Sequence, residues 1–371
     1  MQDILSFLQQ HTNDILADLE KLVRLESPSK HAEGINRVQD AAEGWLKPLG
    51  KVSRHSTDFG DILHTRLTGQ SEERILLLAH VDTVYPVGSW NNLWRVEGDQ
   101  AFGPGSYDMK GGVVQALWAL RAIQSNGQKP GSTIDLLLTP DEEIGSDAGR
   151  PFIEAHARGA KAVLVLEPPY MNGDLKIARK GVGEYLIRVH GKAAHQGVEP
   201  DKGRNAIVSA ARLINDIVNL QDLEKGTTLG PNVIHGGTVS NVVADHAALE
   251  VDLRVWSLPE AQRVDSALRA LQPADGIRFE FSGGLNRPPM EPTDGSLSLF
   301  EKAKGLAEEI GFKVGAARVG GASDGNFTSQ LAPTLDGFGA MGAHAHQKDL
   351  EYIHIPSLAP RTALLAGMLL L

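Results

Sequence analysis

Short apolar runs alternate with longer amphipathic stretches over the first half of the chain. Three runs rich in branched residues are typical of buried strands, and they lie at 75–79, 133–139 and 162–167. Apolar residues at helical spacing predict helices at 2–25, 35–48 and 111–125. Buried strands that alternate with helices predict an α/β layer with a mostly parallel sheet sandwiched by helices.

The pattern changes at about residue 179. From there the chain is expected to form strand, helix, strand, strand, helix and strand, which is the βαββαβ order of the α+β ferredoxin-like unit. Turn-forming residues at 283–291 end this stretch, and the α/β pattern then resumes. The sequence therefore predicts a discontinuous domain, 1–178 and 288–371, with a second domain inserted at 179–287.

Composition narrows the possible functions. A chain of 371 residues suits two domains. The 46 acidic and 36 basic residues give a net charge of −10, which argues against a nucleic-acid partner. There is no cysteine, so disulfides and thiolate chemistry are excluded and a metal would need oxygen or imidazole ligands. Neither a signal peptide nor a run of ~20 apolar residues is visible, so a cytoplasmic location without membrane contact is expected.

Polar clusters follow the predicted strands at their carboxyl ends, where open α/β sheets gather ligands. The clusters are His80 with Asp82, Asp108 in a glycine-rich turn, the acidic run at 141–143, and Glu167. Considered singly, each also fits a structural role, such as a solvated acidic turn that caps the next helix or a hydrogen-bonded pair at a strand end.

Counted together, the clusters favour a metal site. Three consecutive carboxylates beside a buried strand repel one another unless a cation or a proton is present. One histidine is too few for two metals, and either His344 or His346 could supply the second imidazole. The set would then give each metal one histidine and one terminal carboxylate, with Asp108 as the bridge.

These motifs occur in an order that resembles one family over nearly the whole chain. The segments are AHVDTVYP, WRVEGDQAFGPGSYDMKGG, TPDEEIGS, LEPP, HGKAAHQG, SNVV, DLRV, GGASDG and HQKDLEY. They resemble the co-catalytic dizinc peptidases and amidohydrolases, which include glutamate carboxypeptidase, acetylornithine deacetylase and succinyl-diaminopimelate desuccinylase. The first two segments are most similar to glutamate carboxypeptidases of the carboxypeptidase G type.

The resemblance implies two divalent metal ions, zinc in the first place, with cobalt and manganese as alternatives. It implies that His80 and Glu167 complete one metal site, that Glu143 and His346 complete the other, and that Asp108 bridges them. His346 is preferred to His344 because the family ligand stands shortly before a Glu-Tyr pair, here 351–352.

Two further residues take roles in catalysis by the same resemblance. Asp82 would orient His80 through the other ring nitrogen. Glu142 would be the general base that deprotonates a metal-bridging water before it attacks the amide carbonyl.

The inserted domain would act as lid and dimerisation domain. By resemblance, His195 reaches the active site of a partner subunit and stabilises the oxyanion, which predicts a homodimer. Asn241, Arg254 and Gly321 would contact the substrate, and 178–181 and 285–290 would be hinges. On spacing alone, an exposed loop histidine is the better interpretation of His195, and Arg254 fits a surface-paired strand residue equally well.

The leading functional hypothesis is a glutamate-carboxypeptidase-like metallopeptidase that releases a C-terminal amino acid from a small peptide or N-acyl amino acid. The first alternative is an N-acyl amino acid deacylase of the acetylornithine or succinyl-diaminopimelate type. The second is a non-catalytic dimeric metal-binding protein, against which the retention of Glu142 beside Glu143 counts.

Overall fold

The computed structural model describes residues 1–371, which form two compact units. The first unit comprises Met1–Ala178, Pro292–Val319 and Ser323–Leu371, and the second comprises Arg179–Glu291 with Gly320–Ala322. The second unit is thus an insertion that continues past residue 287 to Glu291.

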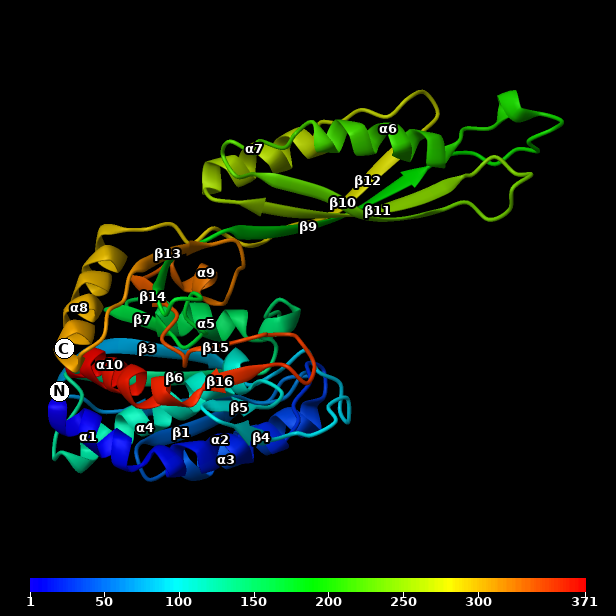
Figure 1. Ribbon diagram of the computed structural model, residues 1–371. Helices are drawn as coiled ribbons and strands as arrows, with labels where there is room; N and C mark the ends of the chain where they lie inside the picture. The colour runs from blue at the N-terminus through cyan, green and yellow to red at the C-terminus, as the bar shows by residue number, and fades with distance from the viewer. The chain divides into compact units, whose positions relative to one another are not determined.

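The first unit is built on an eight-stranded sheet with the order β1-β2-β6-β3-β7-β14-β8-β13 (Figure 1). The strands are β1 (Lys51–His55), β2 (Ile62–Leu67), β3 (Ser71–His80), β6 (Ser132–Thr139), β7 (Ala162–Val165), β8 (Leu175–Arg179), β13 (Ala316–Val319) and β14 (Thr334–Asp336). The central strands β6, β3, β7 and β14 are parallel, whereas β1, β2 and β8 pair antiparallel with their neighbours. The predicted α/β fold with a mostly parallel central sheet is confirmed.

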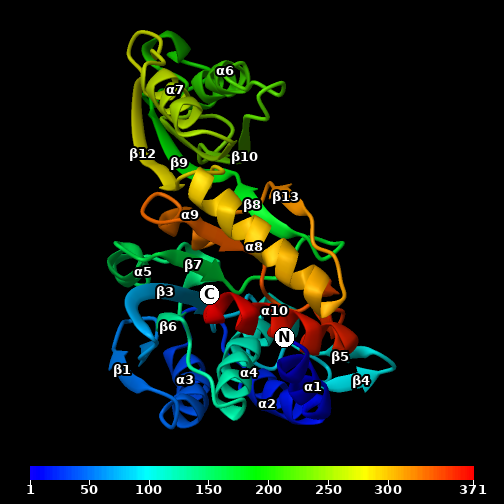
Figure 2. The ribbon, with the colours of Figure 1, turned by 90° about the vertical axis from the view of Figure 1, so that its left-hand side faces the viewer.

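Helices cover both faces of this sheet because alternate strand residues point to opposite sides. Leu77 and Leu136 belong to the core under α1, α2, α3, α4, α8 and α10, and Leu76 and Leu137 to the core under α5 and α9 (Figure 2). The helices are α1 (Gln2–Gln10), α2 (Thr12–Arg24), α3 (Ala32–Leu46), α4 (Gly111–Ser125), α5 (Arg150–Ala157), α8 (Asp294–Ile310), α9 (Gly325–Thr328) and α10 (Leu358–Leu370).

The predicted helix over 2–25 is wrong in one respect, because it is two helices that meet at His11. The Nδ1 atom of His11 lies 2.8 Å from the carbonyl oxygen of Phe7, and the Thr12 hydroxyl donates to the carbonyl of Gln9 at 2.9 Å. Side chains that bond to nearby backbone in this way compete with helix continuation. Apolar periodicity runs across this break and does not reveal it.

A small antiparallel sheet was not predicted. Its order is β15-β16-β5-β4, formed by β4 (Arg95–Glu97), β5 (Gln100–Phe102), β15 (Gly342–Ala343) and β16 (Tyr352–His354). Strands of two or three residues are too short to show alternation. This sheet joins the segment after residue 340 to the segment around residue 100.

The chain also contains four short helical turns, which are η1 (Ser106–Lys110), η2 (Glu142–Ile144), η3 (Pro200–Lys202) and η4 (Ile355–Ser357).

Two buried charged residues lock parts of the first unit. Asp135 on β6 accepts hydrogen bonds from His64 at 2.8 Å, from Arg66 at 2.8 and 3.0 Å and from Arg74 at 3.2 Å. Burial favours its protonated form, but these three donors outweigh burial and hold the pKa of Asp135 well below its usual range. Arg361 on α10 is almost fully buried, and its guanidinium donates to the carbonyls of three glycines, at 339, 173 and 337.

The second unit has the predicted βαββαβ order. It consists of β9 (Gly181–His190), α6 (Ala206–Val218), β10 (Thr228–Gly236), β11 (His246–Val255), α7 (Leu258–Arg269) and β12 (Arg278–Arg287). The strands form an antiparallel sheet in the order β10-β11-β9-β12. Both helices pack on one face over a core that includes Tyr185, Leu249 and Leu213, so the other face is left without a covering layer (Figure 1).

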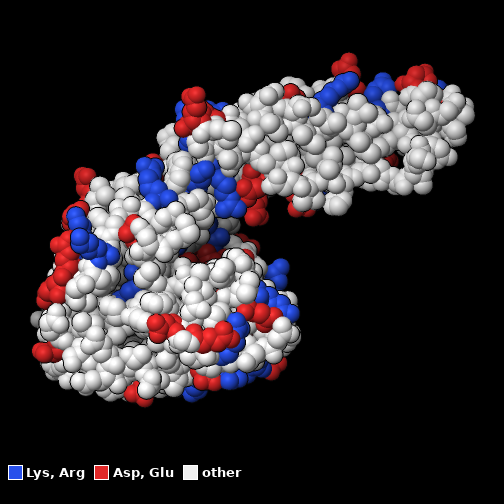
Figure 3. Space-filling model, viewed as in Figure 1, with Lys and Arg blue, Asp and Glu red and all other residues white.

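Surface charge is mixed on the side of the molecule shown in Figure 3. Acidic and basic side chains lie next to one another along the lower part of the first unit, and wide areas of both units carry neither. The net charge of −10 is therefore not gathered into one patch on that side. No helix combines the length and the apolar character needed to cross a membrane.

Candidate metal centre

The side chains of the candidate site lie where the central strands end. His80 is the last residue of β3, Glu143 lies in η2 shortly after β6, and Glu167 follows β7. Because β6, β3 and β7 are parallel neighbours, their carboxyl ends lie together at one edge of the sheet. Asp108 comes from η1 just before α4, and His346 from the loop between β15 and β16.

Asp108 lies between two imidazoles. Its Oδ1 atom is 3.4 Å from Nε2 of His80, and its Oδ2 atom is 3.4 Å from Nε2 of His346. The same nitrogen of His80 is 3.6 Å from Glu167 Oε1, and that of His346 is 3.2 Å from Glu143 Oε2. Each imidazole therefore faces one oxygen of Asp108 and one further carboxylate.

Glu142 belongs to the same cluster. Possible ligand atoms of His80, Glu142 and Glu167 lie within 4.8 Å of one another, and so do those of His80, Asp108 and Glu143. Glu142 is therefore adjacent to the His80 and Glu167 pair, although it follows β6 in the chain.

His346 and His344 sit in different environments. Both residues have left-handed backbone conformations, with φ of 64° and 65°. The side chain of His346 is 51% exposed and turns toward Asp108 and Glu143, whereas Nδ1 of His344 lies 3.2 Å from Oε1 of Gln347. The cluster thus contains His346, the histidine nearer to the Glu-Tyr pair, and His344 contacts Gln347 instead.

Asp82 is fully buried and holds several parts of the cluster. Its carboxylate accepts hydrogen bonds from the backbone N–H groups of Glu142 at 3.1 Å and Glu143 at 3.2 Å, and from the hydroxyl of Ser29 at 2.7 Å. Nδ1 of His80 lies 3.3 Å from its Oδ1 and 3.1 Å from its backbone oxygen. Asp82 therefore positions both the imidazole and the acidic run, and sequence motifs contain no signal for Ser29.

The acidic run divides between two tasks. Glu142 and Glu143 belong to the cluster, whereas Asp141 accepts hydrogen bonds from the backbone N–H groups of Ala148 at 2.7 Å and Gly149 at 3.1 Å. Burial raises the pKa of Asp141 to about 6. Asp141 thus accepts N–H groups just before α5, as a capping residue would, but from a buried position and not from a solvated turn.

Glu351 is another buried carboxylate next to the cluster, and no motif predicted a role for its side chain. Its Oε1 atom accepts hydrogen bonds from the backbone N–H groups of Tyr107 at 2.9 Å and Asp108 at 3.0 Å, and Oε2 accepts from the hydroxyl of Tyr85 at 2.7 Å. Burial raises the pKa of Glu351 to about 7. Lys110 is also buried beside this group, and burial lowers the pKa of its ammonium to about 7 although Glu351 opposes that shift.

The electrostatics of the cluster fit divalent cations. Burial disfavours a charged His80, but Asp108, Asp82 and Glu167 outweigh it and raise its pKa well above the usual value. Asp108 and Glu143 raise the pKa of His346 to about 11. Nε2 of His80, Oδ1 of Asp108 and Oε1 of Glu143 are buried without a hydrogen-bond partner. Two imidazoles and three carboxylates with such atoms are a suitable ligand set for two divalent metals.

The other predicted site residues lie in the second unit. His195 and Asn241 are neighbours, because the backbone N–H of Gln196 donates to the carbonyl of Asn241 at 2.9 Å and His195 pairs with Val242. Arg254 lies at the far end of β11, eight residues after His246, which is about 26 Å along a strand.

Arg254 and Gly321 are each engaged within the second unit. The guanidinium of Arg254 makes a two-pronged contact with Asp252 at 2.8 to 3.1 Å. The carbonyl of Gly321 accepts a hydrogen bond from Arg179 at 3.1 Å. A Cβ atom at Gly321 would meet nothing within 4 Å, so the space beside it is open.

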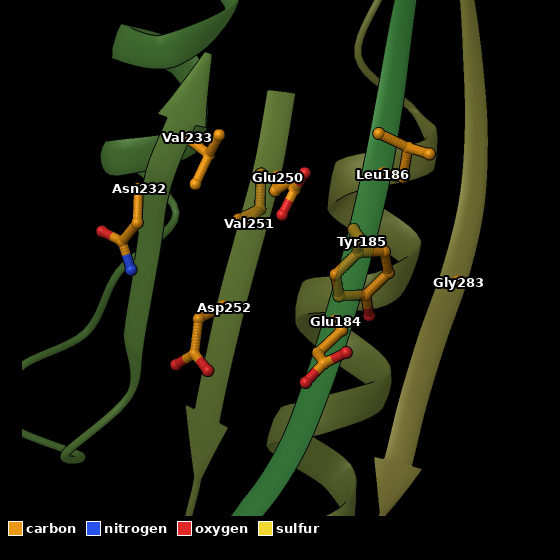
Figure 4. Close-up of a pocket in the computed structure, with 9 residues that line it drawn as sticks. All are labelled: Glu184, Tyr185, Leu186, Asn232, Val233, Glu250, Val251, Asp252 and Gly283. Atoms are coloured by element: carbon orange, nitrogen blue, oxygen red, sulfur yellow. The ribbon is translucent and has the colours of Figure 1, made fainter. Parts of the chain in front are cut away.

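A separate pocket of about 470 Å³ lies on the open face of the second unit's sheet (Figure 4). The carboxylates of Glu184, Glu250 and Asp252 are on this face, and Asp252 pairs directly with Glu184 across the strands. Tyr185 and Val251 alternate with them and belong to the core on the other side. No histidine lines this pocket, so it lacks the mixed ligand set of the cluster in the first unit.

An α/β fold with a histidine and carboxylate cluster at the carboxyl ends of its strands is typical of metal-dependent enzymes. The model of Peptidase family M20/M25/M40 matches residues 76–371. The chain belongs to this family and is an enzyme that acts on amide bonds. The resemblance inferred from its motifs is confirmed.

Individual relatives span nearly the whole chain. Carboxypeptidase G2 of Pseudomonas sp. (strain RS-16) is 30% identical over 373 residues, which cover 96% of this chain and 88% of that protein. A succinyl-diaminopimelate desuccinylase of Thioalkalivibrio sulfidiphilus is 26% identical over 376 residues, which cover 96% of this chain and 98% of that protein. The crystal structure of aminopeptidase PepT from Bacillus cereus matches the fold with a TM-score of 0.79 at 22% identity, over 96% of this chain and 98% of that one.

Proposed function

We propose that this enzyme is a two-zinc carboxypeptidase that releases a C-terminal amino acid, glutamate in the first instance, from a small peptide or N-acyl amino acid. The position of Asp108 between two imidazoles, with Glu142 beside them, carries the proposal. Similarity to carboxypeptidase G2 over 96% of the chain supports the choice of substrate class.

His80 and Glu167 would hold one cation, His346 and Glu143 the other, and Asp108 would contribute one oxygen to each. When bound, two such cations lower the pKa of water and polarise the amide carbonyl. The site can keep them in place because four of these five side chains are mostly buried and Asp82 fixes the ring of His80.

Glu142 would move the protons of the reaction. A carboxylate at this position can accept a proton from the attacking water and pass it to the leaving nitrogen, which must become an amine as the C–N bond breaks. Asp82 would hold Glu142 by its backbone N–H, so the base is positioned by a residue outside the reaction itself.

The second unit would supply substrate contacts in a homodimer. His195 and Asn241 are neighbours, because the N–H of Gln196 donates to the carbonyl of Asn241 at 2.9 Å. We propose that His195 serves the active site of the partner subunit, and that Asn241, Arg254 and Gly321 contact the substrate. A guanidinium suits the capture of the substrate carboxylate.

Exposed apolar side chains support a dimer through this unit. Ile234 and Val233 on the edge strand β10 are 46% and 37% exposed, and Ile207 and Val208 on α6 are 41% and 48% exposed. An edge strand flanked by apolar residues can extend its sheet across a two-fold axis.

The experiment that tests this function is the release of free amino acids from a panel of acyl-glutamates, dipeptides, acetylornithine and succinyl-diaminopimelate. Each substrate is measured with chelator, with zinc and with neither. Release of C-terminal glutamate that chelator abolishes and zinc restores is the expected result. Equal release with and without chelator would refute the two-metal centre.

Two variants separate the base from the ligands. Glu142→Gln should bind both zinc ions and lose turnover by at least about 10²- to 10⁴-fold. His80→Ala should lose zinc as well as turnover, measured by elemental analysis of the purified protein. An active Glu142→Gln enzyme would exclude Glu142 as the base.

A deacylase of the succinyl-diaminopimelate type is the second candidate, because a desuccinylase matches 96% of the chain at 26% identity. The same cluster would serve that reaction, since both substrates present an amide carbonyl. Preferred hydrolysis of succinyl-diaminopimelate in the same panel would select it.

A further inference from the structure

We propose that Glu351 is a positioning residue that fixes Asp108 relative to His346, and that it thereby sets the affinity for the second cation, held by His346, Glu143 and Asp108. This inference rests on the two-cation centre of the proposed function. Glu351 contacts Asp108 through the backbone N–H of Asp108 and does not contact the side chains of the proposed ligands.

The contacts of Glu351 reach the backbone that carries Asp108. One carboxylate oxygen accepts the N–H groups of both Tyr107 and Asp108, and the other accepts the hydroxyl of Tyr85. The residue is fully buried. Hydrogen bonds from N–H and O–H groups to a carboxylate are stronger than those between neutral groups and are geometrically specific. Glu351 therefore fixes the direction in which the Asp108 side chain leaves the main chain.

The same residue ends the loop that carries His346. Within this loop the N–H of Gln347 donates to the carbonyl of His344 at 2.9 Å, and the N–H of Glu351 donates to that of Gln347 at 3.1 Å. The carbonyl of Glu351 in turn accepts from Gly103 at 3.2 Å. Glu351 thus ties a loop near the end of the chain to the turn at 106–110.

His346 depends on such a tie more than His80 does. His80 is 2% exposed and ends a central strand with neighbours on both sides. His346 has a half-exposed side chain and a left-handed backbone, which is unfavourable for a non-glycine residue unless its surroundings hold it. Loss of the Glu351 contacts should therefore weaken the His346 position and spare the His80 position.

The experiment is a zinc titration of the metal-free full-length protein, in competition with a chromogenic chelator, to give two dissociation constants. For Glu351→Ala we expect the weaker constant to rise about 10- to 100-fold, as for other groups that orient ligands. The tighter constant should change by less than about threefold. A purely structural role would lower the melting temperature of the metal-free protein and leave the ratio of the two constants unchanged, which would overturn the inference.

Glu351→Gln is the conservative variant. Its amide oxygen can still accept both backbone N–H groups, and the hydroxyl of Tyr85 can turn to accept from the amide nitrogen. Both constants should stay within about threefold of the wild-type values. A loss as large as that of the alanine variant would show that the acceptor geometry is not what matters.

Asp349→Gly is the matched control in the same loop. Asp349 accepts hydrogen bonds from the backbone and the side chain of Asn91, so its removal loosens the loop without touching Asp108. Its φ of 61° suits glycine, so the change adds no backbone strain. If this variant loses the second zinc as completely as Glu351→Ala, general tethering of the loop explains the effect and the inference fails.

Two further results keep the test decisive. If Glu351→Ala does not fold, Tyr85→Phe removes one of the three hydrogen bonds and should weaken the second constant by about 3- to 10-fold; no change would overturn the inference. If the wild-type protein itself binds fewer than two zinc ions, the proposed function fails first. Two wild-type sites with an unaffected Glu351→Ala variant would refute only the role of Glu351.

Discussion

Replacement of Asp82 by asparagine should damage turnover more than metal binding. The two carboxylate oxygens of Asp82 accept the N–H groups of Glu142 and Glu143 separately. An amide has one acceptor oxygen, so one of these N–H groups must face an NH₂ group. A lost hydrogen bond to a charged acceptor costs about 1.5–3 kcal/mol, which is roughly a 10- to 150-fold loss if it falls on the position of the base.

The ring of His80 should be less affected, because Nδ1 also lies 3.1 Å from the backbone oxygen of Asp82, which the substitution leaves in place. We therefore expect the affinity for zinc to fall by no more than about tenfold. The assay is kcat at saturating zinc together with a zinc titration. Wild-type kcat in Asp82→Asn, or a loss fully recovered by excess zinc, would refute this division of roles.

Three other predictions concern stability and assembly. Because the folded-state pKa of Asp135 is depressed, the stability that its carboxylate contributes is present above about pH 4 and is lost as the pH falls below that value. The free energy of unfolding in urea should therefore fall less between pH 6 and pH 3 for Asp135→Asn than for wild type. An equal fall in both proteins would contradict the assignment. Arg361→Met should lower the free energy of unfolding by at least about 3 kcal/mol, because three buried carbonyls lose their donor; a melting temperature within a degree of wild type would be the opposing result. Ile234→Lys should shift the protein to a monomer, measured as molar mass by light scattering. The control Leu297→Lys, at a position on α8 that is 40% exposed, should not change the molar mass. Equal molar masses for the two variants would argue against the β10 interface.

The cluster of histidines and carboxylates could be predicted because most of its members follow recognisable strands. His80 and Glu167 stand at the ends of apolar runs that are typical of buried strands, and parallel neighbours bring such ends together. The family order of motifs then distinguished His346 from His344. Burial alone would not have done so, since His346 is half exposed.

Contacts between distant segments could not be predicted in the same way. Glu351 lies 243 residues from Asp108 along the chain, and neither residue's local pattern encodes the other. The pair of Asp252 and Arg254 shows a different limit, because the sequence pattern predicted a surface strand position for Arg254 but does not say which partner a guanidinium selects. The small sheet of β4, β5, β15 and β16 forms because tertiary contacts align segments too short to have a preference of their own.

The two ends of the inserted unit meet. The N–H of Arg179 donates to the carbonyl of Met290 at 3.1 Å, and the N–H of Met290 donates back at 3.0 Å. The long insertion Arg179–Glu291 therefore begins and ends at one pair of hydrogen-bonded residues, as a hairpin does at its base. An insertion joined in this way behaves as a cassette: evolution can lengthen, exchange or remove it while the ends of the core strands keep their places.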